Sequence, residues 1–348
     1  MEHDRRRRTW EAGSGRDHIS GLPDELLHDI LGRLRSAAAA ARTSVLSRHW
    51  RRVCASVPEL VLRDDLIRRG ASFLDAFDHA LAAYSAPHVH RLEITVPYDA
   101  PAHLVASWLG FASRRLAGVL RLRFLPCRPP GDLSKPWSLD LHEGEELELP
   151  PCEHATSIEL GLGRLGPPSL LRLPPPPAGT FPALAELEIT VATVEGRALE
   201  ALVSTQCPRL RKLRLRGLTL VAASDFSLCS RMLQHLMFDV EDTLRLYVSA
   251  PALQVLNVES KADHVYVAAP RLAEVVWGSK CAQFVFSDAG SHLRRLEINR
   301  RDAMAPLMRR FNSVDELKLQ LSQRLHYPIV RRIPCTTLLI PLVSTSNY

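Results

Sequence analysis

The chain has 348 residues, an apolar fraction of 46% and a net charge of +6. No run approaches the roughly eighteen apolar residues that cross a bilayer, and the basic start has no apolar segment behind it, so neither a membrane span nor a secretory signal is predicted. The seven cysteines are scattered, odd in number and without a C-x-x-C pair, which argues against a disulfide framework or a metal cluster. We therefore expect reduced thiols and a cytoplasmic or nuclear protein.

The positive charge is too dispersed to indicate nucleic-acid binding. Residues 1–60 hold eleven arginines and eight acidic residues, and the rest of the excess is spread over the remaining chain. A surface that follows a phosphate backbone concentrates its charge more strongly. Residues 1–16, which include Arg5 to Arg8, are expected to form a disordered basic tail, for which a nuclear localisation signal is the alternative.

Residues 17–62 predict three short helices. Pro23 suits the first position of a helix because its missing N–H is not needed there, and the acidic Asp24 and Glu25 then favour the first turn. The next apolar residues fall within an arc of about 140° on a helical wheel: Leu26, Leu27, Ile30, Leu31 and Leu34. A second apolar set recurs at helical spacing: Val45, Leu46, Trp50 and Val53. So short a module buries little surface alone, and we expect it to dock on a partner protein.

The strings DHISGLPDELLHDILGRL and ARTSVLSRHWRRV resemble the F-box in the form common among plant F-box/LRR proteins. The link between them departs from that pattern, because Ser36 and five alanines replace the usual short polar turn. The resemblance implies binding to the Skp-type adaptor of an SCF ubiquitin ligase, and through it to a cullin scaffold.

Matched position by position, the resemblance assigns adaptor contact to nine residues: Leu22, Pro23, Leu26, Leu27, Ile30, Leu31, Val45, Leu46 and Trp50. The alternative is that these residues form the module's own core. We give that alternative most weight at Leu31, Leu34 and Val53, and favour the interface for Leu22 and Pro23.

From about residue 85 to residue 322 one phrase recurs: an apolar residue, two others, an apolar residue, one other, an apolar residue. Its clear copies begin every 19 to 26 residues, at Leu184, Leu210, Leu233, Leu253, Leu272, Leu293 and Val314. Weaker copies begin at Val89, Ala117 and Ala155. This period and core are typical of leucine-rich repeats, whose stacked strands bury the inward apolar row together. The copies resemble the irregular repeats found behind plant F-boxes, because the usual Asn or Cys after the last apolar position is missing.

The expected fold class is therefore α/β, with a short N-terminal three-helix F-box followed by an irregular leucine-rich-repeat solenoid. The expected segments are a helical linker at 63–84, a repeat domain at 85–322 with a proline-rich insertion at about 126–177, and a non-repeat tail at 323–348. Residues that point outward from the strands line the concave face of such a solenoid. The predicted target contacts there are Arg214, Met237, Asn257, Val276, Glu297 and Lys318, with Glu188 in the same set.

Two motifs resemble a cofactor site and a metal site, but the residues around each of them do not complete such a site. Gly161 to Gly166 matches G-x-G-x-x-G, but Pro167 and Pro168 follow where a helix would have to begin. His88 and His90 share a strand face without an acidic or cysteine ligand to complete a site. We find no catalytic constellation and expect no cofactor and no metal.

These features together predict a non-catalytic receptor, in which the F-box recruits the ligase and the repeats select an unknown protein substrate. Two alternatives remain open: a non-degradative interaction scaffold, and a ligand-dependent sensor of the same architecture. Binding to nucleic acid or to a membrane is not expected.

Overall fold

A computed structural model describes residues 22–33, 48–63, 72–97, 100, 102–125, 146–162, 170–175, 181–222, 225–241, 243–279, 281, 283–289 and 293–320. None of the helices in these ranges is long and apolar enough to span a bilayer.

Two of the three helices expected near the N-terminus lie in the described ranges: α1 (Asp24–Arg33) and α3 (Arg48–Cys54). Helix α1 begins directly after Pro23, whose carbonyl oxygen accepts hydrogen bonds from the backbone N–H groups of Leu26 and Leu27, at 3.0 and 3.1 Å. Proline thus precedes the helix where its missing N–H costs nothing, as the sequence predicts. Residues 34–47, which include Val45 and Leu46, lie outside the described ranges.

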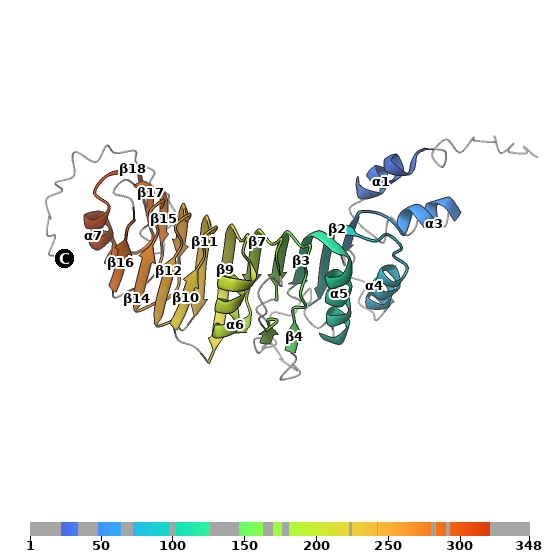
Figure 1. The fold of residues 1–348 in the computed structure, drawn as a ribbon, viewed down its shortest axis with the longest axis horizontal. Coiled ribbons are helices and arrows are strands. Elements are labelled where there is room, and N and C mark those ends of the chain that lie inside the picture. The colour runs from blue at the N-terminus through green and yellow to red at the C-terminus, as the bar shows by residue number, and fades with distance from the viewer. Residues whose placement is uncertain are drawn as a thin grey trace, which may run out of the picture.

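The rest of the described chain is dominated by a parallel sheet whose main strands follow one another in chain order (Figure 1). They are β1 (Glu59–Arg63), β2 (Val89–Pro97), β3 (Leu116–Leu125), β5 (Ser157–Gly161), β7 (Glu186–Thr190), β9 (Lys212–Val221), β11 (His235–Glu241), β13 (Val255–Val258), β15 (Glu274–Trp277), β17 (Leu293–Ile298) and β18 (Val314–Leu319). Three short strands attach through β9, namely β4 (Glu146–Glu148), β6 (Leu170–Arg172) and β8 (Thr193–Glu195).

The repeat phrase accounts for the main strands from β2 to β18. In each copy the second and third apolar residues lie in one strand, for example Leu213 and Leu215 in β9. Because residues two apart on a strand face the same side, both point into the core, where each is 0% exposed. The mixed α/β class and the strand-rich region behind the F-box segment are confirmed.

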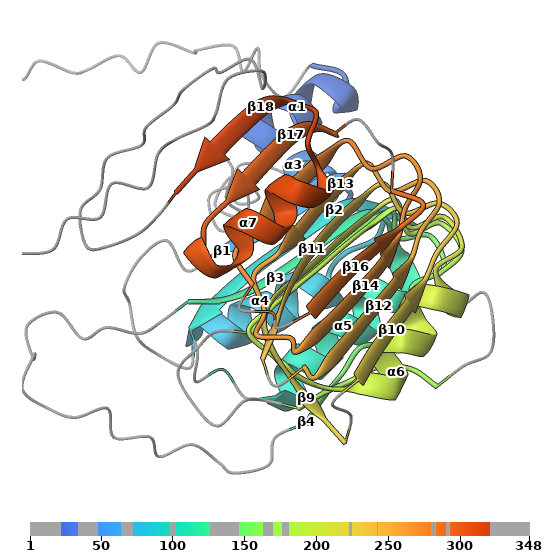
Figure 2. The ribbon, with the colours of Figure 1, turned by 90° about the vertical axis from the view of Figure 1, so that its left-hand side faces the viewer.

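A second parallel sheet was not predicted. It comprises β10 (Asp225–Cys229), β12 (Arg245–Ser249), β14 (His264–Ala268) and β16 (Gln283–Ser287), one between each successive pair of main strands from β9 to β17. Its inward residues pack against the main sheet: Phe226 and Leu228 in β10, Leu246 and Val248 in β12 are fully buried. Each repeat in this region therefore supplies one strand to each of two facing layers (Figure 2).

Four helices complete the described fold behind the F-box segment: α4 (Ser72–Ala82), α5 (Ala102–Arg115), α6 (Gly196–Ala201), which continues into a π-helical turn at Leu202–Gln206, and α7 (Arg301–Arg310). The main sheet bends into an arc, and α4, α5, α6 and the second sheet lie on its outer side (Figure 1). We call the opposite side of the main sheet the inner face.

The first helices and the sheets have separate cores. Leu27, Leu31, Trp50, Val53 and Val57 form one small cluster, and the sheets share one long cluster. Tyr84 joins the two regions, because its hydroxyl lies 3.0 Å from the carbonyl oxygen of Val57 and 2.9 Å from that of His88. Burial of this hydroxyl raises the pKa of Tyr84.

The described elements fall within the expected segments as follows. The sheet begins inside the segment assigned to the F-box, because β1 starts at Glu59 and pairs with β2. The expected helical linker contains α4. The expected proline-rich insertion contains β5, an ordinary member of the main sheet between β3 and β7. The tails at 1–16 and 323–348 lie outside the described residues.

The five cysteines in the described ranges are free thiols: Cys54, Cys152, Cys207, Cys229 and Cys281. Burial raises the pKa of Cys152 and that of Cys207 to about 12, whereas Cys229 is exposed. Iodoacetamide at pH 8 is therefore expected to label Cys229 and spare the other two in the folded protein, with peptide mass spectrometry as the measurement. Unfolding in urea should abolish the difference, and equal labelling of all three in the native protein would contradict this burial.

Candidate functional site

Helix α1 has two apolar sides with different surroundings. Leu27 and Leu31 are 0% and 3% exposed and pack against Trp50, Val53 and Val57. Leu27, Leu31 and Trp50 were assigned to adaptor contact by resemblance, and the structure places all three in the module's own core. Leu22 is half-buried against the same cluster.

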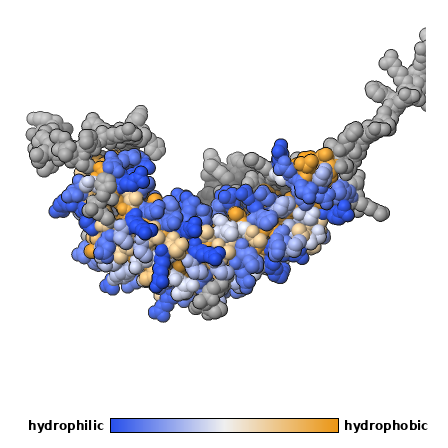
Figure 3. All heavy atoms as spheres, turned by 45° about the horizontal axis from the view of Figure 1, so that its top comes forward, coloured by the Kyte–Doolittle hydropathy of each residue, from blue (hydrophilic) through white to orange (hydrophobic). Residues whose placement is uncertain are grey.

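The other apolar side of α1 faces outward. Leu26 is 51% exposed, Ile30 is 40% exposed, and Pro23 is also exposed. Their spacing of three and four residues puts them on one face of a helix. We call Pro23, Leu26 and Ile30 the exposed stripe. Figure 3 shows apolar atoms gathered at the end of the molecule that carries α1.

Polar contacts hold α1 against α3 and so fix which side faces outward. The His28 Nε2 atom lies 3.2 Å from the Val53 carbonyl oxygen and 3.2 Å from the Ser56 hydroxyl. Near the start of α1, Asp24 Oδ1 lies 3.3 Å from His49 Nε2. These contacts join the first half of α1 to His49 and Val53 of α3 and to Ser56 after it, so a rotation of α1 that buries the stripe would break them.

On the inner face, the strand register brings the predicted target contacts into one line. Glu188, Arg214, Met237 and Asn257 are successive register partners on β7 to β13. Val276, Glu297 and Lys318 continue the line to β18. We call this line the central row; on the other side it extends through Glu159, Arg121 and Glu93 to Val61 on β1. All six predicted residues lie in it.

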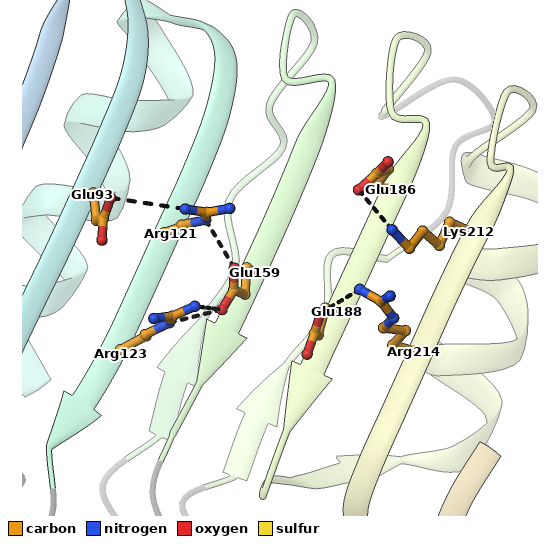
Figure 4. A network of polar contacts seen from close by, with 8 residues as sticks. All are labelled: Glu93, Arg121, Arg123, Glu159, Glu186, Glu188, Lys212 and Arg214. Atoms are coloured by element: carbon orange, nitrogen blue, oxygen red, sulfur yellow. Dashed lines mark hydrogen bonds and ion pairs between the residues drawn. The ribbon is translucent and has the colours of Figure 1, made fainter. Parts of the chain in front are cut away.

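Charges in the first half of the central row are paired across strands (Figure 4). Arg121 Nε lies 2.9 Å from Glu159 Oε2, and its Nη1 lies 4.0 Å from Glu93 Oε2. Arg123 also donates to Glu159. Two strands further on, Arg214 Nη1 lies 3.3 Å from Glu188 Oε2. Because each cation has a carboxylate beside it, this part of the face presents little unbalanced charge.

The charged residues at the far end of the central row are also paired, whereas the middle of the row carries no charged residue. Lys318 Nζ lies 3.1 Å from Glu297 Oε2, and Arg295 lies within 4.0 Å of both Glu297 and Glu316. Between the two paired regions the row consists of Met237, Asn257 and Val276, all half-buried. The central row thus has an uncharged middle between two charged flanks.

Sequence reasoning missed Glu93, Arg121 and Glu159 as parts of this face. Their signal is present, since each stands between the second and third apolar residues of a weak repeat copy. Only the structure shows that their charges alternate from strand to strand and so form pairs. The residues of Gly161–Gly166 after Leu162 lie outside the described ranges. Within those ranges, no group of three or more His, Cys, Asp or Glu is placed to hold a metal ion.

The chain also matches known proteins over part of its length. The family model described as F-box-like matches residues 19–60. An F-box protein of Arabidopsis thaliana is 34% identical over 113 residues, which cover 32% of this chain and 35% of that protein. F-box/LRR-repeat protein 25 of the same plant is 32% identical over 108 residues, 31% of this chain and 40% of that protein. A further F-box/LRR-repeat protein is 36% identical over 83 residues, 24% of this chain and 18% of its own length.

The chain thus spans less than half the length of these relatives. Its family match ends at residue 60, where the described chain passes from helix α3 into strand β1. Residues 19–60 thus carry an F-box-like segment, and part of this chain is similar to plant proteins that carry the F-box or F-box/LRR-repeat name.

Proposed function

We propose that the chain is the substrate-recognition subunit of an SCF-type ubiquitin ligase. The exposed stripe of α1 binds the Skp-type adaptor, which links the chain to a cullin scaffold. The inner face of the main sheet binds the target protein. The chain supplies no catalytic residue of its own, because ubiquitin transfer belongs to other subunits of the ligase.

One observation carries the proposal: the exposed stripe lies directly beside residues that form the module's core. Apolar side chains at Leu26 and Ile30 face away from Trp50, although burying them would stabilise the fold. Contiguous exposed apolar surface on a helix favours a partner that covers it. Leu22 borders the stripe, and Val45 and Leu46 belong to the same proposed contact.

The arrangement of the two regions suits a connector. The F-box segment has a core of its own and meets the sheets through Tyr84 and Val57. A partner on the exposed stripe and a partner on the inner face would therefore contact different elements. In this proposal the three-helix F-box lies within residues 17–62, and the sheets form a curved leucine-rich-repeat solenoid.

The half-life of a bound partner protein distinguishes a substrate receptor from a non-degradative scaffold. The partner that the full chain captures should have a shorter half-life in plant cells that express the wild type than in cells that express Leu26→Ser with Ile30→Ser. Both forms should bind the partner equally, because the stripe lies outside the inner face. Equal half-lives under equal binding would exclude the receptor function and favour the scaffold.

A further inference from the structure

The inner face concentrates its unpaired charge on three strands at its centre. In the described ranges, Asp239 on β11, Glu259 after β13 and Glu274 on β15 take part in no ion pair. Of the cations next to these carboxylates in the register, Arg295 is engaged by other carboxylates, whereas Arg216 on β9 stands beside Asp239 and leaves Glu259 and Glu274 as the unbalanced charges. Arg295, the register partner of Glu274, lies within 4.0 Å of Glu297 and Glu316. Arg216 is the register partner of Asp239, whose carboxylate accepts a hydrogen bond from the backbone N–H of Gly217 at 3.1 Å.

An apolar group lies among these carboxylates. Met237, Val255 and Val276 stand on three neighbouring strands around Asn257, and all are half-buried. We call Met237, Val255 and Val276 the apolar island. Because paired strands lie about 4.8 Å apart, Met237 and Val276 are roughly 10 Å from each other across the sheet. The island thus spans three strands, with Asn257 between Met237 and Val276.

Carboxylates border the island at both ends along the strand direction. Glu274 is the register partner of Val255, near the start of the strands. Glu259 stands at the other end, beside Gly278, where an added Cβ would lie 3.4 Å from the Glu259 Cγ atom. Its Cγ atom therefore lies beside the glycine, and its Oε1 atom accepts a hydrogen bond from Asn257 Nδ2 at 3.3 Å. The register position of Glu274 and that of Glu259 are four residues apart, which corresponds to about 13 Å along a strand. We call these two positions the two carboxylate rows.

We infer that the inner face binds an extended segment of the target protein in which one apolar side chain stands between two Lys or Arg residues. The apolar side chain covers Met237 and Val276, and the cations meet Glu259 and Glu274. A cation two residues before and one two residues after the apolar position match the separation of the two rows, because strand residues advance about 3.3 Å each.

The flanks of the face favour this occupant over an acidic one. Their charges are already paired, so they form a polar rim that adds no unbalanced charge, while the centre is desolvated on binding. A segment with Asp or Glu at the same positions would place like charges beside Glu259 and Glu274. The inference rests on the proposed function, because it names the chemistry of the target that the receptor takes.

A displayed library of random ten-residue peptides, with the full-length chain as bait, tests the inference. The wild type is expected to enrich peptides with Lys or Arg two residues on either side of an apolar residue. A bait that carries Glu259→Lys with Glu274→Lys should enrich acidic residues at those positions instead. A matched bait with Glu148→Lys and Glu153→Lys, both exposed and outside the inner face, should enrich the wild-type pattern.

The enriched peptide then gives a quantitative check. Glu259→Gln with Glu274→Gln is expected to weaken its Kd about tenfold, because two charge-assisted contacts are lost. Enrichment of acidic or uncharged peptides by the wild type would overturn the inference, as would no enrichment or the same pattern from all three baits. The selection needs no adaptor. A failed selection would therefore not count against adaptor binding. Likewise, a failure to bind the adaptor would not count against a successful selection.

Discussion

Much weaker adaptor binding is the expected result of replacing Leu26 and Ile30 by serine. Full burial of a leucine or isoleucine side chain contributes about 1.5–3 kcal/mol, and each of these two is about half exposed. Their removal should therefore cost about 2 kcal/mol of binding free energy, or roughly 30-fold in Kd. Titration calorimetry with a purified Skp-type adaptor measures this change.

The chain offers a matched control for that variant. Leu244 and Val285 are 49% and 55% exposed, but they lie at the second sheet, far along the chain from α1. Leu244→Ser with Val285→Ser removes a comparable apolar surface and should leave the Kd for the adaptor unchanged. Because the stripe is already exposed, neither pair should lower the free energy of unfolding appreciably. An unchanged Kd for the stripe variant would show that the adaptor contacts another surface.

Replacing Trp277 by alanine is expected to destabilise the repeats by about 3–5 kcal/mol. Trp277 on β15 is 0% exposed, and its ring lies 5.2 Å from that of Phe284 and 5.9 Å from that of Phe286, both on the second sheet. Phe286 in turn contacts Phe311 beyond α7 at 5.0 Å. The indole therefore links both sheets, and its loss leaves a cavity between them. Urea unfolding of the purified chain measures the change.

Two further variants make this result specific. Tyr247→Ala removes an exposed ring on β12 and should cost less than about 1 kcal/mol. Trp277→Phe should retain most of the stability, because the buried indole Nε1 has no hydrogen-bond partner among the described residues. If Trp277→Ala cost no more than Tyr247→Ala, the two sheets would not share the core described above.

The main strands could be predicted from the sequence because the last two apolar residues of each repeat copy are two positions apart, which is the spacing of residues on one face of a strand. Leu256 and Val258, for example, alternate with Asn257 and so define both faces of β13. The second sheet was missed because its strands are short and its signal, such as Leu246 and Val248, is only two apolar residues long. Helix α5 was also missed, although its signal is longer. Val105, Trp108 and Leu109 recur at helical spacing, and all three are buried.

The division of α1 could not be predicted. Leu26 and Leu27 are the same residue type and fall in the same apolar arc, yet one is half exposed and the other is buried. The packing of α3 decides between them, and a helical wheel contains no information about that neighbour. The ion pairs of the inner face could not be predicted either, because predicting them requires the register of the paired strands. Arg121 and Glu159 are 38 residues apart in the chain and meet only because β3 pairs with β5.

Ubiquitin transfer in a reconstituted SCF reaction tests the account most directly. The substrate is a carrier protein fused to the peptide enriched by the inner face, and the receptor is the full chain. We predict transfer with the wild type, and its loss both with Leu26→Ser and Ile30→Ser and with Glu259→Lys and Glu274→Lys. The Leu244→Ser and Val285→Ser variant should support transfer as the wild type does. Undiminished transfer by the stripe variant would contradict the claim that α1 connects this chain to the ligase.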